Sequence, residues 1–156
     1  MKCPNCGKEI GVEDKICKTC DFDLEKYRNT VESGISKVSE EDVTKALEKS
    51  DIAITKAGTL SKRGGIFLKL FMRIELLVML LKDWGGKKYK EVPWTTIAAV
   101  AFAILYFVNP FDLIPDFIPG VGYLDDIAVL ALVFMSIEYE LKKYAQWKGL
   151  NLEDYF

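Results

Sequence analysis

Four cysteines are the residues in this sequence whose type and spacing most directly indicate chemistry. They form two Cys-x-x-Cys pairs within the first twenty residues: Cys3, Cys6, Cys17 and Cys20. Two intervening residues let both thiolates of a pair turn toward one ion, and two such pairs complete a tetrahedral sulfur shell, which suits Zn²⁺. The chain contains no histidine, so four thiolates are the common zinc shell that it can build. A shell of four thiolates leaves no position for a substrate, and we therefore expect the zinc to be structural.

Two alternatives for the cysteines are a pair of disulfides and a redox-active pair. The chain begins Met1-Lys2-Cys3 without an apolar signal segment, so we expect its N-terminus in the cytosol, where thiols stay reduced. Redox motifs rarely come as two symmetric pairs. The pattern resembles the short zinc-ribbon modules at the ends of many prokaryotic proteins, which serve as interaction modules or folding staples. Twenty residues cannot bury a core, so metal binding must supply the folding energy.

Four aspartates form a second candidate site: Asp112, Asp116, Asp125 and Asp126. They are the only charged residues from Val92 to Ile137, and carboxylates suit Mg²⁺, Mn²⁺ or Ca²⁺. The alternative is helix capping, because Asn109-Pro110-Phe111-Asp112 is typical of a helix start and Asp125 and Asp126 precede the next apolar run. Three prolines and two glycines between Asn109 and Gly122 exclude one continuous helix across this segment.

Two apolar segments flank the aspartates. Val92–Val108 carries no charge over 17 residues, which as a helix measures about 25 Å against a hydrocarbon core of about 30 Å. Ile127–Ile137 is shorter, at roughly 17 Å. Lysines precede the first segment and follow the second, so the positive-inside rule predicts that both ends of this hairpin are cytoplasmic. We expect association with a lipid bilayer, by a hairpin that spans or re-enters it; the alternative is a hairpin buried in a soluble cytoplasmic protein.

Upstream segments also have helical patterns. Ser39 is a predicted cap for a helix that runs to about Ala57, since three acids follow it directly. Ile66–Lys82 is a second, strongly apolar helix with Lys69 and Arg73 on one face. The polar segment Asp21–Lys37 is predicted to be a linker with room for a short helix. The sequence thus predicts a mainly α fold: a small helical domain with an apolar hairpin, preceded by the zinc ribbon.

The stretch Leu105–Asp126 resembles the defining motif of the YkvA-like domains of unknown function, approximately Y-x-x-S-P-x-D-L-I-P-D-x-x-P-x-x-G-Y-x-D-D. Asn109 replaces the usual serine, and both residues cap helices well. The resemblance implies a small helical domain, commonly membrane-associated, without an established activity. With it the chain divides into a zinc ribbon (1–24), a linker (25–38), a YkvA-like helical domain (39–148) and a C-terminal tail (149–156).

Three function classes remain open. The chain has no nucleophile elbow, P-loop or dinucleotide fingerprint, so we expect a membrane-associated, non-enzymatic protein whose ribbon binds a protein partner. The alternatives are a soluble, homo-oligomeric interaction module and a divalent-metal enzyme that uses the aspartates on a lipid or phosphorylated substrate. Nucleic acid is not an expected ligand, because the ribbon's lysines are balanced by acids.

Overall fold

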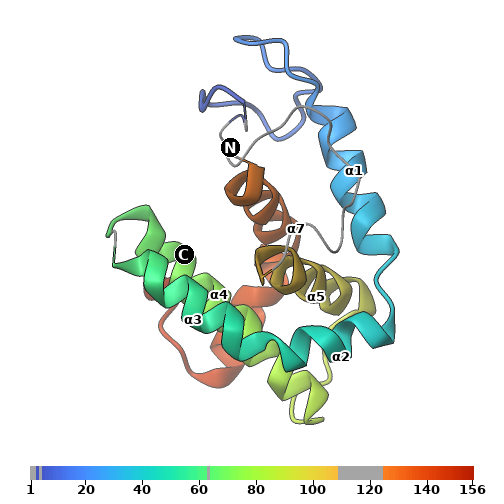
Figure 1. The fold of residues 1–156 in the computed structure, drawn as a ribbon, viewed down its shortest axis with the longest axis vertical. Helices are drawn as coiled ribbons and strands as arrows, with labels where there is room; N and C mark the ends of the chain where they lie inside the picture. Colours follow the sequence, from blue (N-terminus) through green and yellow to red (C-terminus); the bar gives the residue numbers. More distant parts are fainter. Residues whose placement is uncertain (1–2, 4, 63, 109–124) are drawn as a thin grey trace.

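Helices make up most of the chain. The computed structural model describes residues 3, 5–62, 64–108 and 125–156. Its helices, which enclose a shared apolar core, are α1 (Leu24–Ser36), α2 (Glu40–Glu48), α3 (Ser50–Ser61), α4 (Ile66–Gly85), α5 (Trp94–Val108), α7 (Asp125–Lys148) and α8 (Leu152–Tyr155) (Figure 1). Outside the helices, Ile16 and Asp23 form an isolated antiparallel bridge. The predicted mainly α fold is confirmed.

Helix α5 lies at the centre of the bundle. All its side chains from Thr96 to Phe107 are buried, and it contacts α1, α2, α3, α4 and α7. Four of the buried residues are alanines, whose small side chains let neighbouring helices approach closely: Ala98, Ala99, Ala101 and Ala103. The first apolar segment of the predicted hairpin therefore fills the protein core, and α7 packs beside it. Across the residues described here, no helix has both the length and the hydropathy needed to cross a membrane.

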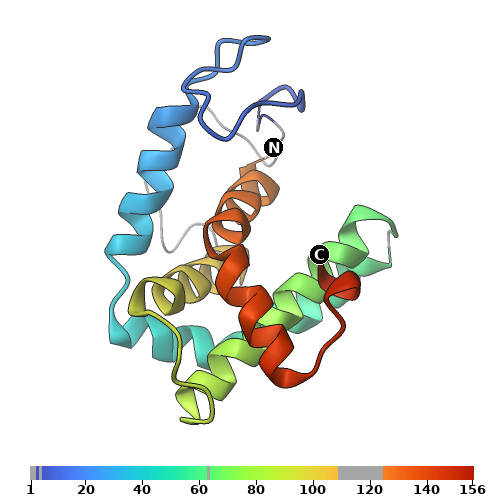
Figure 2. The same ribbon diagram turned by 180° about the vertical axis from the view of Figure 1, so that it is seen from behind.

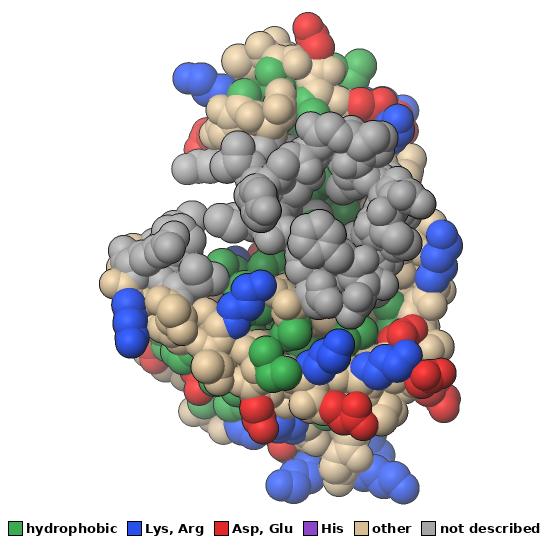
Figure 3. Space-filling view, in the orientation of Figure 1, with side chains coloured by type: hydrophobic (Ala, Val, Ile, Leu, Met, Phe, Trp, Pro, Cys, Tyr) green, Lys and Arg blue, Asp and Glu red, His purple; other side chains and the backbone are tan. Residues whose placement is uncertain are grey.

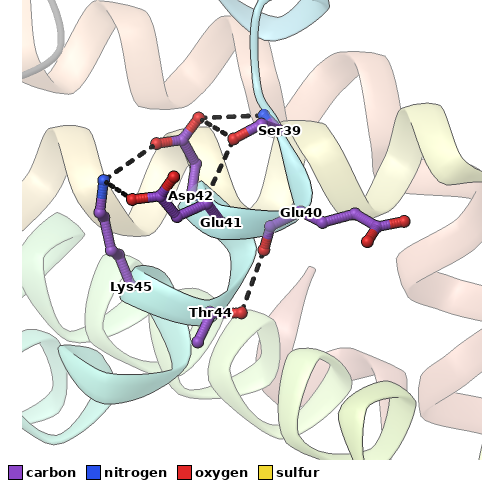
Figure 4. Close-up of polar contacts among 6 residues, drawn as sticks. All are labelled: Ser39, Glu40, Glu41, Asp42, Thr44 and Lys45. Carbon is purple, nitrogen blue, oxygen red and sulfur yellow. Dashed lines mark hydrogen bonds and ion pairs between the residues drawn. The ribbon is translucent and has the colours of Figure 1, made fainter.

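Helix α2 begins where the sequence predicts. The Ser39 hydroxyl accepts a hydrogen bond from the backbone N–H of Asp42 at 3.3 Å, and the Asp42 carboxylate accepts one from the N–H of Ser39 at 2.9 Å (Figure 4). This reciprocal capping box fixes the first turn. The predicted continuation to Ala57 is wrong, because α2 ends at Glu48 and α3 begins at Ser50. Ser50 is buried at this junction, where its hydroxyl donates to the Leu47 carbonyl at 2.7 Å.

Helix α1 occupies most of the segment that the sequence predicts as a linker with room for a short helix. It has 13 residues, and Leu24, Tyr27 and Val31 lie buried on one side at helical spacing. Gly34 lets α1 approach α5, since a Cβ atom there would lie 2.7 Å from the Phe102 ring. The two views show α1 beside α5 (Figures 1 and 2). The segment contributes to the core.

Helix α4 connects with the C-terminal residues at two points. Near its start, Arg73 Nε donates to the Tyr155 carbonyl at 2.8 Å, and its guanidinium lies over the rings of Phe134 and Phe156. Near its end, the Asp83 carboxylate accepts hydrogen bonds from Tyr144 and Lys148 of α7. The sequence places Arg73 on a basic stripe, but the structure uses it to hold α8 against α4.

Candidate metal centre

The two cysteine pairs lie in turns that share one backbone path. Each turn ends on a residue with positive φ, Gly7 at 72° and Asp21 at 55°, directly after its second cysteine. Glycine adopts this conformation readily and aspartate tolerates it. Each turn is closed by two equivalent backbone hydrogen bonds. In the first turn, Gly7 N–H donates to the Cys3 carbonyl (2.9 Å) and Cys3 N–H donates to the Lys8 carbonyl (2.8 Å). In the second, Asp21 N–H donates to the Cys17 carbonyl (2.8 Å) and Cys17 N–H donates to the Phe22 carbonyl (2.9 Å).

The four sulfur atoms converge on one point. Cys3 Sγ lies 3.7 Å from Cys20 Sγ, Cys6 Sγ lies 3.6 Å from Cys17 Sγ, and all four sulfurs lie within 4.8 Å of one another. A tetrahedron with Zn–S bonds of about 2.3 Å has edges of about 3.8 Å. These separations also exceed a disulfide bond of about 2.05 Å, and the four cysteines are free thiols. The sulfur arrangement therefore fits a tetrahedral metal ion.

Backbone N–H groups oppose the effect of burial on the two buried thiols of the site, Cys3 and Cys17. Cys17 is fully buried, and the N–H groups of Thr19 and Cys20 lower the pKa of its thiol to about 6 against the opposing effect of burial. At Cys3, burial raises the pKa, opposed by the N–H groups of Cys6 and Asn5. Backbone N–H groups that bond to a metal-binding thiolate orient it and stabilise its charge. A bound zinc ion would cross-link the two turns, and its four sulfur ligands would leave no position for a substrate.

Helix α1 supports the loop between the two turns. Arg28 donates to the carbonyls of Asp14, at 3.1 Å, and Gly11, at 3.4 Å. The Asp14 carboxylate in turn accepts from the Gly11 N–H at 2.7 Å, and the Lys15 carbonyl accepts from the Leu24 N–H at 2.8 Å. Sequence reasoning missed Arg28. The signal that could have found it is the helical spacing of the apolar residues Leu24, Tyr27 and Val31. That spacing indicates a helix, from which Arg28 can contact the loop between the two turns.

The aspartate hypothesis falls largely outside the described residues. Asp112 and Asp116 belong to the segment 109–124, which is not described. Asp125 and Asp126 form the start of α7, but their side chains are not described either. Neither a divalent-metal site nor a capping role for the four carboxylates has been tested, and both stay predictions.

Comparison with known proteins decides the family. Residues 96–132 match the family described as "Protein of unknown function (DUF1232)". The "Uncharacterized membrane protein YkvA" of Bacillus subtilis (strain 168) is 39% identical over 80 residues, which cover 51% of this chain and 76% of that protein. The chain belongs to the DUF1232 family. No solved structure matches it.

The DUF1232 match runs from α5 to α7 and contains the segment with the prolines and aspartates. The predicted resemblance to YkvA-like domains is thereby confirmed. The four cysteines precede the match, so the candidate metal centre is an addition to the part that defines the DUF1232 family.

Proposed function

We propose that this protein is a membrane-associated, non-enzymatic protein that carries a structural zinc ion in its cysteine module, residues 3–23. The single observation that carries the proposal is the convergence of four sulfur atoms at tetrahedral spacing. Four thiolates fill the coordination sphere of the ion, so the metal has a structural role. The module then offers a rigid surface for binding a protein partner. The N- and C-terminal segments lie on the cytoplasmic side, where thiols remain reduced.

Membrane association is supported by the family. The Bacillus subtilis relative carries the name of a membrane protein, and this chain covers 76% of its length. Fractionation of cells that produce the full chain tests this part. We expect the protein in the membrane pellet. Recovery entirely in the soluble fraction, without detergent, would overturn membrane association.

Zinc is tested by metal analysis of the purified chain. We expect one zinc ion per chain, released when a thiol-modifying reagent titrates the cysteines. The Cys17→Ser variant removes a buried ligand and should lose the metal, whereas Ser36→Ala, at an exposed hydroxyl outside the module, should keep it. A wild-type chain that is folded and metal-free in zinc-containing buffer would contradict the structural zinc.

The cysteine module also exposes apolar side chains suited to a protein partner. Val12 is 63% exposed and Ile16 is 54% exposed, both in the loop between the two turns. Affinity purification should retain a partner with the wild-type chain and lose it with Val12→Ser combined with Ile16→Ser. Ile52→Ser, at a 55% exposed position on α3, is the matched control and should retain it. Equal retention of the partner by both variants would show that Val12 and Ile16 do not form the binding surface.

A further inference from the structure

A turn rich in lysine joins α4 to α5 at one end of the bundle. Lys87, Lys88 and Lys90 are exposed, and within the described residues none of them makes an ion pair with a carboxylate. We call these three side chains the basic turn. Lys and Arg side chains gather at the lower end of the molecule in Figure 3, where this turn lies in Figure 1.

The backbone holds the basic turn in a fixed conformation. Lys88 N–H donates to the Asp83 carbonyl at 2.9 Å and Lys87 N–H donates to the Trp84 carbonyl at 3.0 Å, with Lys87 at φ 59°. These bonds form a Schellman-type end to α4. Tyr89 is buried, with its ring 5.2 Å from Tyr144. Because Tyr89 points inward, the lysines on either side of it are directed to solvent.

Two exposed tryptophans flank the basic turn. Trp94, at the start of α5, is 43% exposed and packs against Trp84 at 6.1 Å. Trp147, near the end of α7, is 51% exposed and packs against Tyr89 at 4.8 Å. Indole rings with one side packed and the other wet are typical of the boundary between headgroups and acyl chains.

We propose that the basic turn and its flanking tryptophans dock this protein on an anionic membrane surface. This inference rests on the proposed membrane association and names the surface and the lipid charge. Each lysine near an anionic bilayer strengthens binding about fivefold, so three together contribute on the order of a hundredfold. Binding of this kind needs no lipid-spanning helix.

Nucleic acid is the other polyanion that lysines could attract. Single-stranded binders present free aromatic faces on which bases stack. Trp147 instead stacks on Tyr144, with ring planes 24° apart, and also contacts Tyr89. These two contacts occupy part of the indole ring and leave Trp147 51% exposed, which suits a contact at the bilayer interface. The aromatic arrangement therefore favours a membrane.

Co-sedimentation of the full, zinc-loaded chain with vesicles tests the docking. We expect binding to phosphatidylcholine vesicles that contain phosphatidylglycerol, weak binding to phosphatidylcholine alone, and a loss of affinity as salt rises. Lys87→Gln, Lys88→Gln and Lys90→Gln together should weaken binding on the order of a hundredfold. The control triple, Lys8→Gln, Lys18→Gln and Lys62→Gln, removes the same charge from other exposed lysines and should weaken it less than about fivefold.

Tryptophan fluorescence supplies a second readout. Vesicles with brominated acyl chains should quench the wild-type emission. The variant Trp94→Phe with Trp147→Phe keeps only the half-buried Trp84, and its emission should be quenched much less. Unchanged thermal unfolding of each variant shows that the fold is retained.

Three results would overturn the docking surface: equal weakening by the two lysine triples, no preference for anionic vesicles, or tighter binding to polyuridylate than to vesicles. If the lysine triple still pellets with cell membranes as the wild type does, the docking surface is wrong while membrane association stands. If the wild-type chain binds no vesicle and fractionates as soluble, both proposals fail.

Discussion

The cysteine module and the helical bundle are stabilised in different ways. The module's small buried cluster consists of Cys3, Ile10, Cys17 and Leu24, so half of it is made of candidate metal ligands. The bundle buries apolar side chains from α1 through α8 around the central helix α5. We expect a region with so little apolar surface to depend on a bound metal ion, whereas the bundle depends on burial. The two regions of this chain are therefore expected to have separate sources of stability.

The two regions meet at Phe22, whose ring packs against both clusters and lies 5.7 Å from the Tyr27 ring in an edge-on arrangement. They also meet along α1, where Leu24 belongs to the module's cluster and Arg28 donates to the carbonyls of Asp14 and Gly11. The regions are therefore adjacent but share few side chains. Metal removal, acid and single substitutions should therefore affect the two regions separately.

Removing the metal should have the largest effect and should act on one region. Structural zinc contributes on the order of 10 kcal/mol to such modules. We expect a strong chelator to abolish amide protection at Cys3, Cys17 and Asp21 in hydrogen exchange, while the amides of α5 stay protected. Simultaneous loss of protection in α5 would show that the two regions form one cooperative unit.

Acid should act on the bundle in turn. Burial opposes ionisation of Asp83, but hydrogen bonds from Lys148 and Tyr144 outweigh it and hold the pKa of the carboxyl below its ordinary value. A lowered pKa in the folded state gives stability that is present above about pH 4 and is lost as the pH falls through the folded value. Asp83→Asn should lose about 2–3 kcal/mol at neutral pH and flatten the acid dependence of unfolding.

Asp51→Asn is the control for this change. Asp51 is a carboxylate whose ion pair with Lys82, at 3.0 Å, lies on the surface. Its loss should change the free energy of unfolding by less than about 0.5 kcal/mol. Urea unfolding curves at several pH values measure both variants. Equal effects of the two substitutions would mean that the buried carboxylate does not stabilise the α4–α7 contact.

Two glycines in the bundle should respond in opposite directions to the same change. Gly34→Ala places a methyl group 2.7 Å from Phe102, which is fully buried, and should destabilise by about 1–2 kcal/mol despite the gain in helix propensity. Gly58→Ala, in α3, adds a methyl group whose nearest neighbour among the described residues is the Phe71 ring at 3.7 Å, and it should stabilise by about 0.5–1 kcal/mol. Urea unfolding measures both. Stabilisation by both substitutions would contradict the close approach of α1 to α5.

A similarly small effect is expected where the backbone has positive φ without glycine. Lys87 has φ 59° at the end of α4, so Lys87→Gly should relieve strain and raise the free energy of unfolding by about 0.5–1 kcal/mol. Lys88→Gly, at the next position, should lower it. Asp21→Gly makes the corresponding change in the cysteine module and should leave bundle unfolding unchanged. A shift of the bundle transition by Asp21→Gly would show that the cysteine module and the bundle unfold as one cooperative unit.

The predictions from sequence were most accurate where a strong signal lies within a short stretch of chain. The cysteine spacing, the Ser39 cap and the apolar run of α5 each depend on residues a few positions apart, and the structure bears out their local geometry. The prediction of α1 was weaker, because its mean polarity suggests a linker while its buried positions are spread among charged ones. Gly34 looks like a helix breaker in the sequence and proves to be a contact point.

Long-range pairings could not be predicted from one sequence. Asp83 and Lys148 are 65 positions apart, and Arg73 and Tyr155 are 82 apart. Nothing in their local patterns distinguishes them from exposed charged residues or ordinary tails. The break between α2 and α3 was also missed, because the apolar spacing continues across the junction at Lys49.

The position of α5 in the chain has a consequence for synthesis. Helix α1 packs on α5 and α7, so during translation it has no helical partner until residues 94–108 have left the ribosome. The four cysteines, by contrast, lie within residues 3–20 and can bind metal as soon as they emerge. The nascent chain would then carry a folded cysteine module while the helices that follow it are still unfolded. The bundle assembles at a later stage, after α5, its most apolar helix, has left the ribosome.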